Sequence, residues 1–427
     1  MMLSRRFAAT VAGAVAVAFL SSGADWRQFR GTDNRGVSDT RVPTTWSVTE
    51  NEESNLAWKV ALPGEGVSSP IVVDGRVFVT CASGPKQDRL HVVCLDSETG
   101  KRLWERQFWA TGRTICHPTS SVAAPTPASD GRLVMALFSS NDLVCLDLEG
   151  NLRWLRGLTA DFPTAANDVG MASSLLVAGK TVVAQVECEG ESFAAGMDTA
   201  NGLTRWKIPR ARQMNWSSPA LLPRGDDRGD VVLLQSATRL TAHDAESGAE
   251  LWSHQAGCST IASPVADRRV VYLPSEGLTA LQSTEGSRSV DVLWRENRLS
   301  TDNASPVVHD GKVYAVNGAG VLNCGDAASG EVLWQLRLKG PFWATPVLAA
   351  GHLFLVNQDG RAHVVKIGEK GELVGTSEFG EEIYGSPAVA DGALYVRSNS
   401  RLWKIAENAP RAASTKPHRV PRRSLVR

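Results

Sequence analysis

The segment LDSETGKRLW, residues 95–104, decides the fold because its pattern returns along the chain. In each copy a polar turn ends in Gly, and a Trp follows four residues later. These pairs are Gly100 and Trp104, Gly150 and Trp154, Gly202 and Trp206, Gly248 and Trp252, and Gly330 and Trp334, with Trp58 and Trp294 continuing the series beside altered turns. Repetition at a period of about 40–50 residues indicates stacked or radially arranged units rather than several independent domains.

A second landmark, a Ser or Thr followed by Pro, opens each unit. It occurs at Ser69-Pro70, Thr126-Pro127, Ser218-Pro219, Ser263-Pro264, Ser305-Pro306, Thr345-Pro346 and Ser386-Pro387, and Ser173-Ser174 fills the missing place between the second and third. In the first unit Asp74-Gly75 then separates two apolar runs. This predicts a hairpin, because both residues of such a turn need positive φ. A third strand leads into the Gly turn and a fourth carries the Trp, so each unit is predicted to be a four-stranded antiparallel sheet.

Counting the units predicts an all-β fold, an eight-bladed β-propeller over residues 56–406. Residues 386–405 supply only three strands, and residues 56–61 form one unmatched strand near the start. Pairing that early strand with the last three closes the circle and removes an exposed sheet edge. In the seventh unit Gly375 stands where a Trp is expected, which predicts looser outer packing there.

We interpret the repeated Trp residues as docking groups between neighbouring blades. One buried indole covers about 150–250 Å², so a ring of such contacts contributes strongly to stability. This structural role is assigned to Trp58, Trp104, Trp154, Trp206, Trp252, Trp294 and Trp334.

The two ends of the chain differ from the repeats. Residues 1–24 place Arg5 and Arg6 before an apolar run and end in small residues, the order of a cleaved secretory signal, and both general and twin-arginine export remain open. No Cys lies near the expected cleavage after Ala24, so we expect a periplasmic or secreted protein without a lipid anchor. Residues 25–55 form an N-terminal extension. Residues 407–427 are basic and Pro-containing and are predicted to be a disordered tail, either solvated or acting as a binding arm.

Bulk composition narrows the function classes. Lys plus Arg and Asp plus Glu number 45 each, so the net charge is zero, which argues against a general nucleic-acid binder. No second stretch is long and apolar enough to predict a transmembrane segment. The seven Cys include no adjacent pair and no Cys-x-x-Cys, and we interpret most of them as small packed side chains.

The run at residues 95–104 resembles the pyrroloquinoline-quinone-type (PQQ-like) repeat, and the resemblance extends over about residues 56–405. Two branches share this repeat: the quinoprotein alcohol and glucose dehydrogenases, and non-enzymatic propellers similar to BamB of the outer-membrane assembly machine. The opening segment, residues 25–31, also resembles exported bacterial propellers of this group. The resemblance implies that the enzyme branch carries a vicinal disulfide and a Ca²⁺ held by Glu, Asn and Asp. This chain has no adjacent Cys, and that ligand triplet cannot be placed in it.

We therefore expect a non-catalytic binding or scaffold protein of the cell envelope, with no catalytic residues, no metal site and no cofactor. The alternative is a PQQ-dependent alcohol or sugar dehydrogenase that uses PQQ with calcium. The expected partner is a protein, a peptide or a cell-envelope component, and the chain is expected to be a monomer.

In propellers of this type, the residue three before the Pro position lies near the axis of one face. Here these residues are Val67, Ala124, Met171, Trp216, Ile261, Asn303, Trp343 and Tyr384. Trp216, Trp343, Tyr384, Asn303 and Met171, with Phe342 nearby, are the candidate binding residues of the channel mouth. Aromatic groups at a concave mouth suit a flat ligand or an inserted peptide, although they can also simply fill the channel.

Two insertions, residues 107–123 and 157–170, are expected to add to the rim of this face. They supply the candidate rim residues Trp109, Arg113, His117, Asn167 and Asp168. The neighbours Cys116 and His117 have the chemistry of metal ligands or of a nucleophile and its base, but no third partner can be identified in the sequence.

Overall fold

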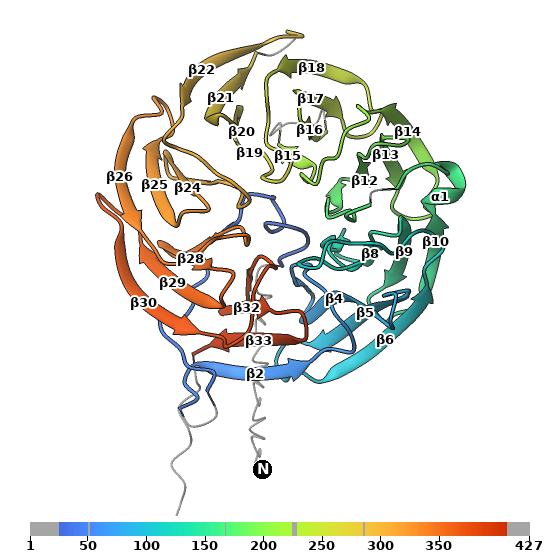
Figure 1. Ribbon diagram of the computed structural model, residues 1–427, viewed down its shortest axis with the longest axis horizontal. Helices are drawn as coiled ribbons and strands as arrows, with labels where there is room; N and C mark the ends of the chain where they lie inside the picture. The colour runs from blue at the N-terminus through green and yellow to red at the C-terminus, as the bar shows by residue number, and fades with distance from the viewer. Residues whose placement is uncertain (1–24, 50–51, 167, 224–228, 285–286, 408–427) are drawn as a thin grey trace, which may run out of the picture.

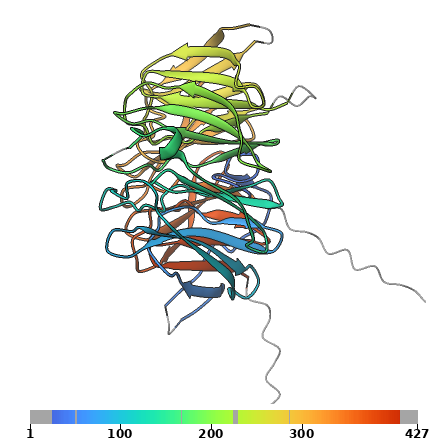
Figure 2. The same cartoon turned by 90° about the vertical axis from the view of Figure 1, so that its right-hand side faces the viewer.

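Eight four-stranded sheets surround a central axis in the computed structural model (Figure 1), as the repeat predicts. The structure describes residues 25–49, 52–166, 168–223, 229–284 and 287–407. The expected signal segment 1–24 and residues 408–427 of the expected tail lie outside these ranges. Seen from the side, the ring is a thick disc (Figure 2). The eight-bladed, all-β prediction is confirmed.

Blades 1–7 each follow the chain from the innermost to the outermost strand. Blade 1 holds β3 (Ile71–Val73), β4 (Arg76–Ser83), β5 (Arg89–Asp96) and β6 (Arg102–Trp109); blade 2 holds β7 (Ala128–Ser129), β8 (Leu133–Leu137), β9 (Asp142–Asp147) and β10 (Leu152–Gly157). Blade 3 holds β11 (Leu176–Ala178), β12 (Thr181–Val186), β13 (Phe193–Asp198) and β14 (Thr204–Pro209); blade 4 holds β15 (Ala220–Leu222), β16 (Val231–Ser236), β17 (Arg239–Asp244) and β18 (Glu250–Gln255). Blade 5 holds β19 (Val265–Asp267), β20 (Val270–Ser275), β21 (Gly277–Ser283) and β22 (Val290–Glu296); blade 6 holds β23 (Val307–His309), β24 (Lys312–Val316), β25 (Val321–Asp326) and β26 (Val332–Arg337). Blade 7 holds β27 (Val347–Ala349), β28 (His352–Val356), β29 (Arg361–Lys366) and β30 (Glu372–Glu378).

Blade 8 joins the two ends of the propeller. Its strands are β31 (Ala388–Ala390), β32 (Ala393–Arg397), β33 (Arg401–Ala406) and, on the outside, β2 (Leu56–Ala61). β2 runs antiparallel to β33, with Leu56 opposite Ile405 and Ala61 opposite Arg401. The early strand therefore closes the ring, as predicted.

At five of the eight blade junctions an indole docks one blade on the next through a hydrogen bond to a backbone carbonyl. The Nε1 of five Trp residues donates a hydrogen bond of 2.9–3.0 Å to a carbonyl in the next blade, from Trp58, Trp104, Trp154, Trp206 and Trp294 to Ser97, Leu148, Thr199, Ala245 and Ala327 respectively. The turn Gly lies under the indole face. At Gly100, whose φ is +71°, an added Cβ would lie 2.7 Å from the Trp58 ring. This Gly is therefore needed both for its backbone conformation and for the close approach of the ring.

Blade 7 lacks its own Trp, and residues from the N-terminal segment occupy that place. An added Cβ at Gly375 would clash with the carbonyl oxygen of Thr44. Trp46 is buried, and its ring centre lies 6.4 Å from that of Phe354 and 6.0 Å from that of Phe379. The expectation of looser outer packing is therefore wrong, because a distant Trp packs there instead.

Within the segment predicted as an N-terminal extension, residues 25–38 cross the central channel at one end. Figure 1 shows this blue segment in the middle of the propeller. Its contacts reach the inner strands of six blades: Trp26 with Val72, Arg27 with Ser129, Gln28 with Val177, Asn34 with Leu221, Arg30 with the Pro264 carbonyl, and β1 (Val37–Ser38), which adds in parallel to β27. These residues, together with Trp46, make the expected extension part of the propeller core.

The described part of the chain has one short helix, α1 (Leu158–Asp161), in the insertion after blade 2. Within the described ranges, no helix has the length and apolar character needed to span a membrane.

Replacing Trp46 with Ala is expected to lower the free energy of unfolding by about 3–5 kcal/mol, because a large buried ring leaves a cavity over blade 7. The matched control is Trp109→Ala, since Trp109 is 63% exposed, and this change should cost less than about 1 kcal/mol. Urea denaturation followed by circular dichroism measures both. Equal losses for the two variants would show that Trp46 does not complete the packing of blade 7.

Candidate functional site

A ring of hydroxyl groups lines the central channel, one from each blade. From Ser69 to Thr345 each backbone N–H donates to the hydroxyl of the next blade over 2.9–3.1 Å, in the order Ser69, Thr126, Ser174, Ser218, Ser263, Ser305, Thr345 and Ser386. These seven consecutive bonds explain why the unit opens on Ser or Thr: only a short hydroxyl side chain reaches the neighbouring amide. The Pro that usually follows has no N–H of its own to be satisfied there.

The hydroxyl ring encircles a cavity of about 450 Å³. Phe29, from the segment that crosses the channel, also lines the cavity, so this segment is part of its wall. Residues 117, 119 and 120 from one insertion and 169 and 170 from the other line it as well. The channel is therefore occupied by protein at one end and holds a pocket around its axis. This volume lies within the range of roughly 300–1,000 Å³ typical of ligand pockets.

Three aromatic side chains shape the wall of this pocket. The Trp343 and Tyr384 rings meet edge to face, with centres 6.2 Å apart, and Trp343 is 37% exposed. Trp216 comes from blade 4 and donates from its Nε1 to the Gly170 carbonyl over 2.8 Å, which fixes the indole against the second insertion. Gln358 donates to the Tyr384 hydroxyl over 3.1 Å. Burial, and then the charge of Glu382, raise the pKa of Tyr384, so its phenol stays neutral at pH 7.

The predicted mouth residues fall into two groups. Trp216, Trp343, Tyr384 and Asn303 line the pocket, together with Val67, Ala124 and Ile261. Met171 and Phe342 do not belong to its lining and are instead buried in the core clusters around blades 2–3 and 6–7. In the third unit Ala172 takes the lining position, because Ser174 and not Ser173 belongs to the hydroxyl ring. The prediction of Met171 was therefore one residue out of register.

Phe342 precedes the mouth residue Trp343 in the chain, but its ring turns into the core. Its centre lies 5.7 Å from that of His363 in β29, and its exposed fraction is 1%. Successive residues of an extended segment point to opposite sides, so one of the pair faces the pocket and the other the blade.

The candidate rim residues do not form one cluster. His117 lines the pocket, and its Nδ1 lies 2.8 Å from the Thr119 hydroxyl. Arg113 and Asp168 form an exposed ion pair of 2.8 Å. Trp109 ends β6, where the Arg89 guanidinium lies 5.5 Å from its ring centre. Asn167 lies outside the described residues. Only His117 therefore joins the mouth residues in the lining of the pocket.

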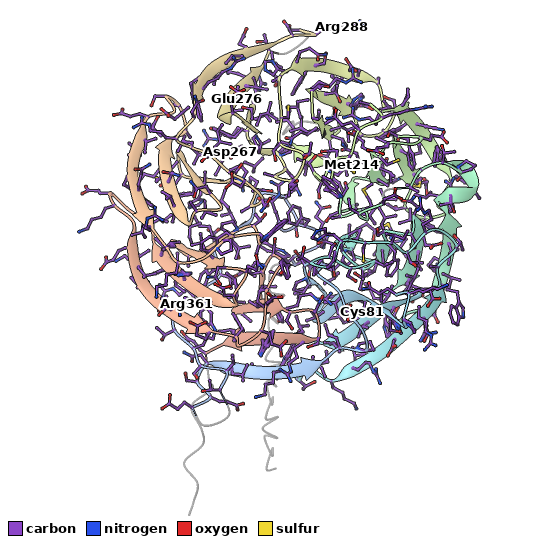
Figure 3. The ribbon with its side chains drawn as sticks, in the orientation of Figure 1. Cys81, Met214, Asp267, Glu276, Arg288 and Arg361 are labelled. Atoms are coloured by element: carbon purple, nitrogen blue, oxygen red, sulfur yellow. The ribbon has the colours of Figure 1, made fainter. Side chains whose placement is uncertain are left out.

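The cysteines occupy packing positions. All seven lie within the described ranges and none forms a disulfide. Cys94 and Cys145 pair opposite Trp104 and Trp154, and burial raises the pKa of each thiol to about 12. Cys81 lies in β4 of blade 1, far around the ring from Met214, which precedes β15 of blade 4 (Figure 3).

The residues around the pocket do not fit pyrroloquinoline quinone with calcium. The quinone carries three carboxylates, and a buried anion needs a cation or a metal beside it. No Lys, Arg, Asp or Glu of the described residues lines the pocket. The described part of the chain also holds no group of three or more His, Cys, Asp or Glu arranged for a metal ion. Asn303 is thus a pocket-lining amide without the carboxylates that a calcium site requires.

Sequence reasoning missed two parts of the site. The hydroxyls were visible as a repeated landmark, yet their role as acceptors between blades appears only in three dimensions. Phe29 was visible within the segment at residues 25–31, but nothing in the spacing places that segment inside the channel.

The fold and the pocket define an eight-bladed PQQ-like repeat propeller whose channel is partly filled by its own N-terminal segment. The family described as outer membrane protein assembly factor BamB matches residues 33–222, 217–324, 287–370 and 320–412, and the chain belongs to this family. Among its relatives, the outer membrane protein assembly factor BamB of Legionella pneumophila (strain Paris) is 25% identical over 40% of this chain and 47% of its own. That of Yersinia pestis is 21% identical over 71% of this chain and 66% of its own. The chain thus spans about half of the first relative and somewhat under two thirds of the second.

Solved structures of a BamB protein and of an alcohol dehydrogenase both share the fold. BamB from Moraxella catarrhalis has a TM-score of 0.59 and 17% identity, covering 83% of this chain and 98% of its own. The quinohemoprotein alcohol dehydrogenase from Comamonas testosteroni has a TM-score of 0.67 and 13% identity, covering 90% of this chain and 81% of its own. At such identities the likeness concerns the fold alone.

Replacing Ser263 with Ala is expected to lower the free energy of unfolding by about 1–3 kcal/mol, because the buried Ser218 N–H loses its acceptor. Ser120→Ala is the matched control: Ser120 also lines the pocket but is not in the hydroxyl ring, and the change should stay within about 0.5 kcal/mol. Urea denaturation compares the two. A loss for Ser263→Ala no larger than that of the control would show that the ring does not hold the blades together.

Proposed function

We propose that this protein is an exported, monomeric, non-catalytic propeller of the cell envelope, and that it binds a protein partner at the aromatic mouth of its channel. One observation carries the proposal: the pocket on the axis is walled by Trp343, Tyr384 and Trp216, and Trp343 remains more than one third exposed. Large rings in concave, partly exposed positions are the groups that most often dominate the affinity of protein interfaces.

Family membership supports the biological setting. The relatives are described as outer membrane protein assembly factors, so the proposed partner is a protein of outer-membrane assembly. Export by a signal in residues 1–24 to the periplasm, without a lipid anchor, is part of the same proposal. The chain covers only part of these relatives, so the partner surface is argued from this chain's own mouth and not from theirs.

Site-specific photocrosslinking in the cells that produce the protein tests the proposal. A photoreactive phenylalanine at Asn303, on the pocket wall, should give discrete adducts with envelope proteins. The same group at Leu203, which is 68% exposed outside the pocket, should not give them. The double variant Trp343→Ala, Tyr384→Ala should reduce the adducts at Asn303 by about tenfold or more, because each lost hot-spot ring costs at least one decade in affinity.

Three results would contradict this function. Adducts at Asn303 that persist in the double variant would show that the mouth is not the binding surface. Dye reduction by alcohols or sugars after addition of quinone and Ca²⁺ to the purified protein would instead establish a dehydrogenase. Adducts to envelope polysaccharide in place of protein would change the class of partner.

A further inference from the structure

The lining of the pocket has a consistent chemical character that goes beyond its shape. Its described residues carry aromatic, aliphatic, thioether, hydroxyl, amide and imidazole groups or, at Gly170, no side chain, and none of them is a Lys, Arg, Asp or Glu. The Arg30 guanidinium carbon lies 5.3 Å from the ring centre of Phe29, which lines the pocket. Arg30 is fully buried and does not line the pocket, so Phe29 and not the guanidinium is presented to an occupant. An ionised group entering the pocket would lose its hydration without gaining a partner.

The rings are placed on two sides of the axis. Trp343 and Tyr384 belong to blades 7 and 8, whereas Trp216 and Met214 precede the inner strand of blade 4. Because eight blades follow one another around the ring, blade 4 lies across the axis from blade 8 (Figure 1). A planar group inserted along the axis would therefore have aromatic surface on both sides and the Phe29 ring also in contact with the cavity. Aromatic pairs prefer offset and edge-on contacts of this kind.

The hydroxyl ring supplies the remaining polarity. In its seven bonds each oxygen accepts an N–H from the preceding blade, so the hydroxyl proton is still available to donate. The pocket can thus satisfy a neutral oxygen acceptor, such as a phenol or an amide carbonyl, at the tip of an apolar group. It offers much less to an ion of either sign.

We infer that the pocket receives an uncharged aromatic side chain, of the tyrosine type, carried by a protruding loop of the partner, and that it does not hold the carboxylated quinone of the enzyme branch. The volume of about 450 Å³ accommodates one such side chain with part of its backbone. This inference rests on the proposed function, since it names the group by which the partner is anchored at that mouth.

Ligand-observed saturation-transfer NMR on the full chain tests the inference. N-acetyl-tyrosinamide is the neutral aromatic probe, the blocked amides of aspartate and lysine are charged controls, and pyrroloquinoline quinone with Ca²⁺ represents the rival ligand. We expect transfer to the tyrosine probe alone. Ala172→Phe should abolish it by filling the pocket from blade 3 without removing any wall ring, and Trp343→Ala should weaken binding about 2- to 10-fold.

Leu203→Ala, outside the pocket, should leave the transfer unchanged and thereby controls for handling of the variants. Melting curves identify variants that fail to fold. Ala172→Phe fills the pocket, whereas Trp343→Ala removes a ring from its wall, so the two variants test the pocket independently. Quinone binding that Ala172→Phe removes, or tyrosine transfer that persists in this variant, would overturn the inference. Absence of tyrosine transfer together with mouth-dependent crosslinks at Asn303 would also overturn it, while leaving the proposed function intact. If Asn303 gave no protein adducts while saturation transfer to the tyrosine probe still depended on the pocket, the proposed partner would be contradicted. The inferred chemistry of the pocket would then stand.

Discussion

The hydrogen bonds between consecutive hydroxyls and amides around the axis are the constraint on which the pocket depends. Each bond ties the start of one blade to the start of the next, at nearly constant length. The indoles make the corresponding contacts at the outer strands, where Trp206 reaches the Ala245 carbonyl and packs on Gly248. Blades that are joined at both their inner and their outer strands cannot slide independently. Side chains from eight separate units therefore converge on one cavity.

The N-terminal segment reduces the axial channel that the ring of blades leaves open. An eight-membered ring alone leaves an axial channel, and the segment from Trp26 to Val37 fills part of it by bonding to the inner strands. These bonds satisfy backbone groups at the start of the blades that would otherwise need water. Phe29 then lines the pocket, and Trp46 later completes blade 7. One stretch of about 20 residues thus performs two packing tasks that no repeat unit encodes.

Repetition explains which features could be predicted from sequence. Trp104, Gly150 and Ser218 recur at equivalent places, so their strands, turns and order around the axis follow from the period. The same rule misplaced Met171, because Ser173-Ser174 offers two registers and only the bond from Thr126 to Ser174 chooses between them. Features that occur once carry no such signal. Glu187 and Arg210, both fully buried and 2.6 Å apart between their polar atoms, form an internal ion pair that no spacing pattern indicates.

The axial residues of this chain, rather than its blades, limit what the pocket can bind. The hydroxyl ring and the docked indoles hold the sheets together whatever occupies the axis, so they can persist while the wall residues change. In this chain the wall positions carry Val67, Ile261, Asn303, Trp343 and Tyr384, a set that stabilises apolar and neutral groups. A carboxylated cofactor would require at least one of these positions to carry a charge. Under the proposed function, the apolar wall and the hydroxyl ring suit the recognition of a side chain, because the free energy available there comes from ring contacts and neutral hydrogen bonds.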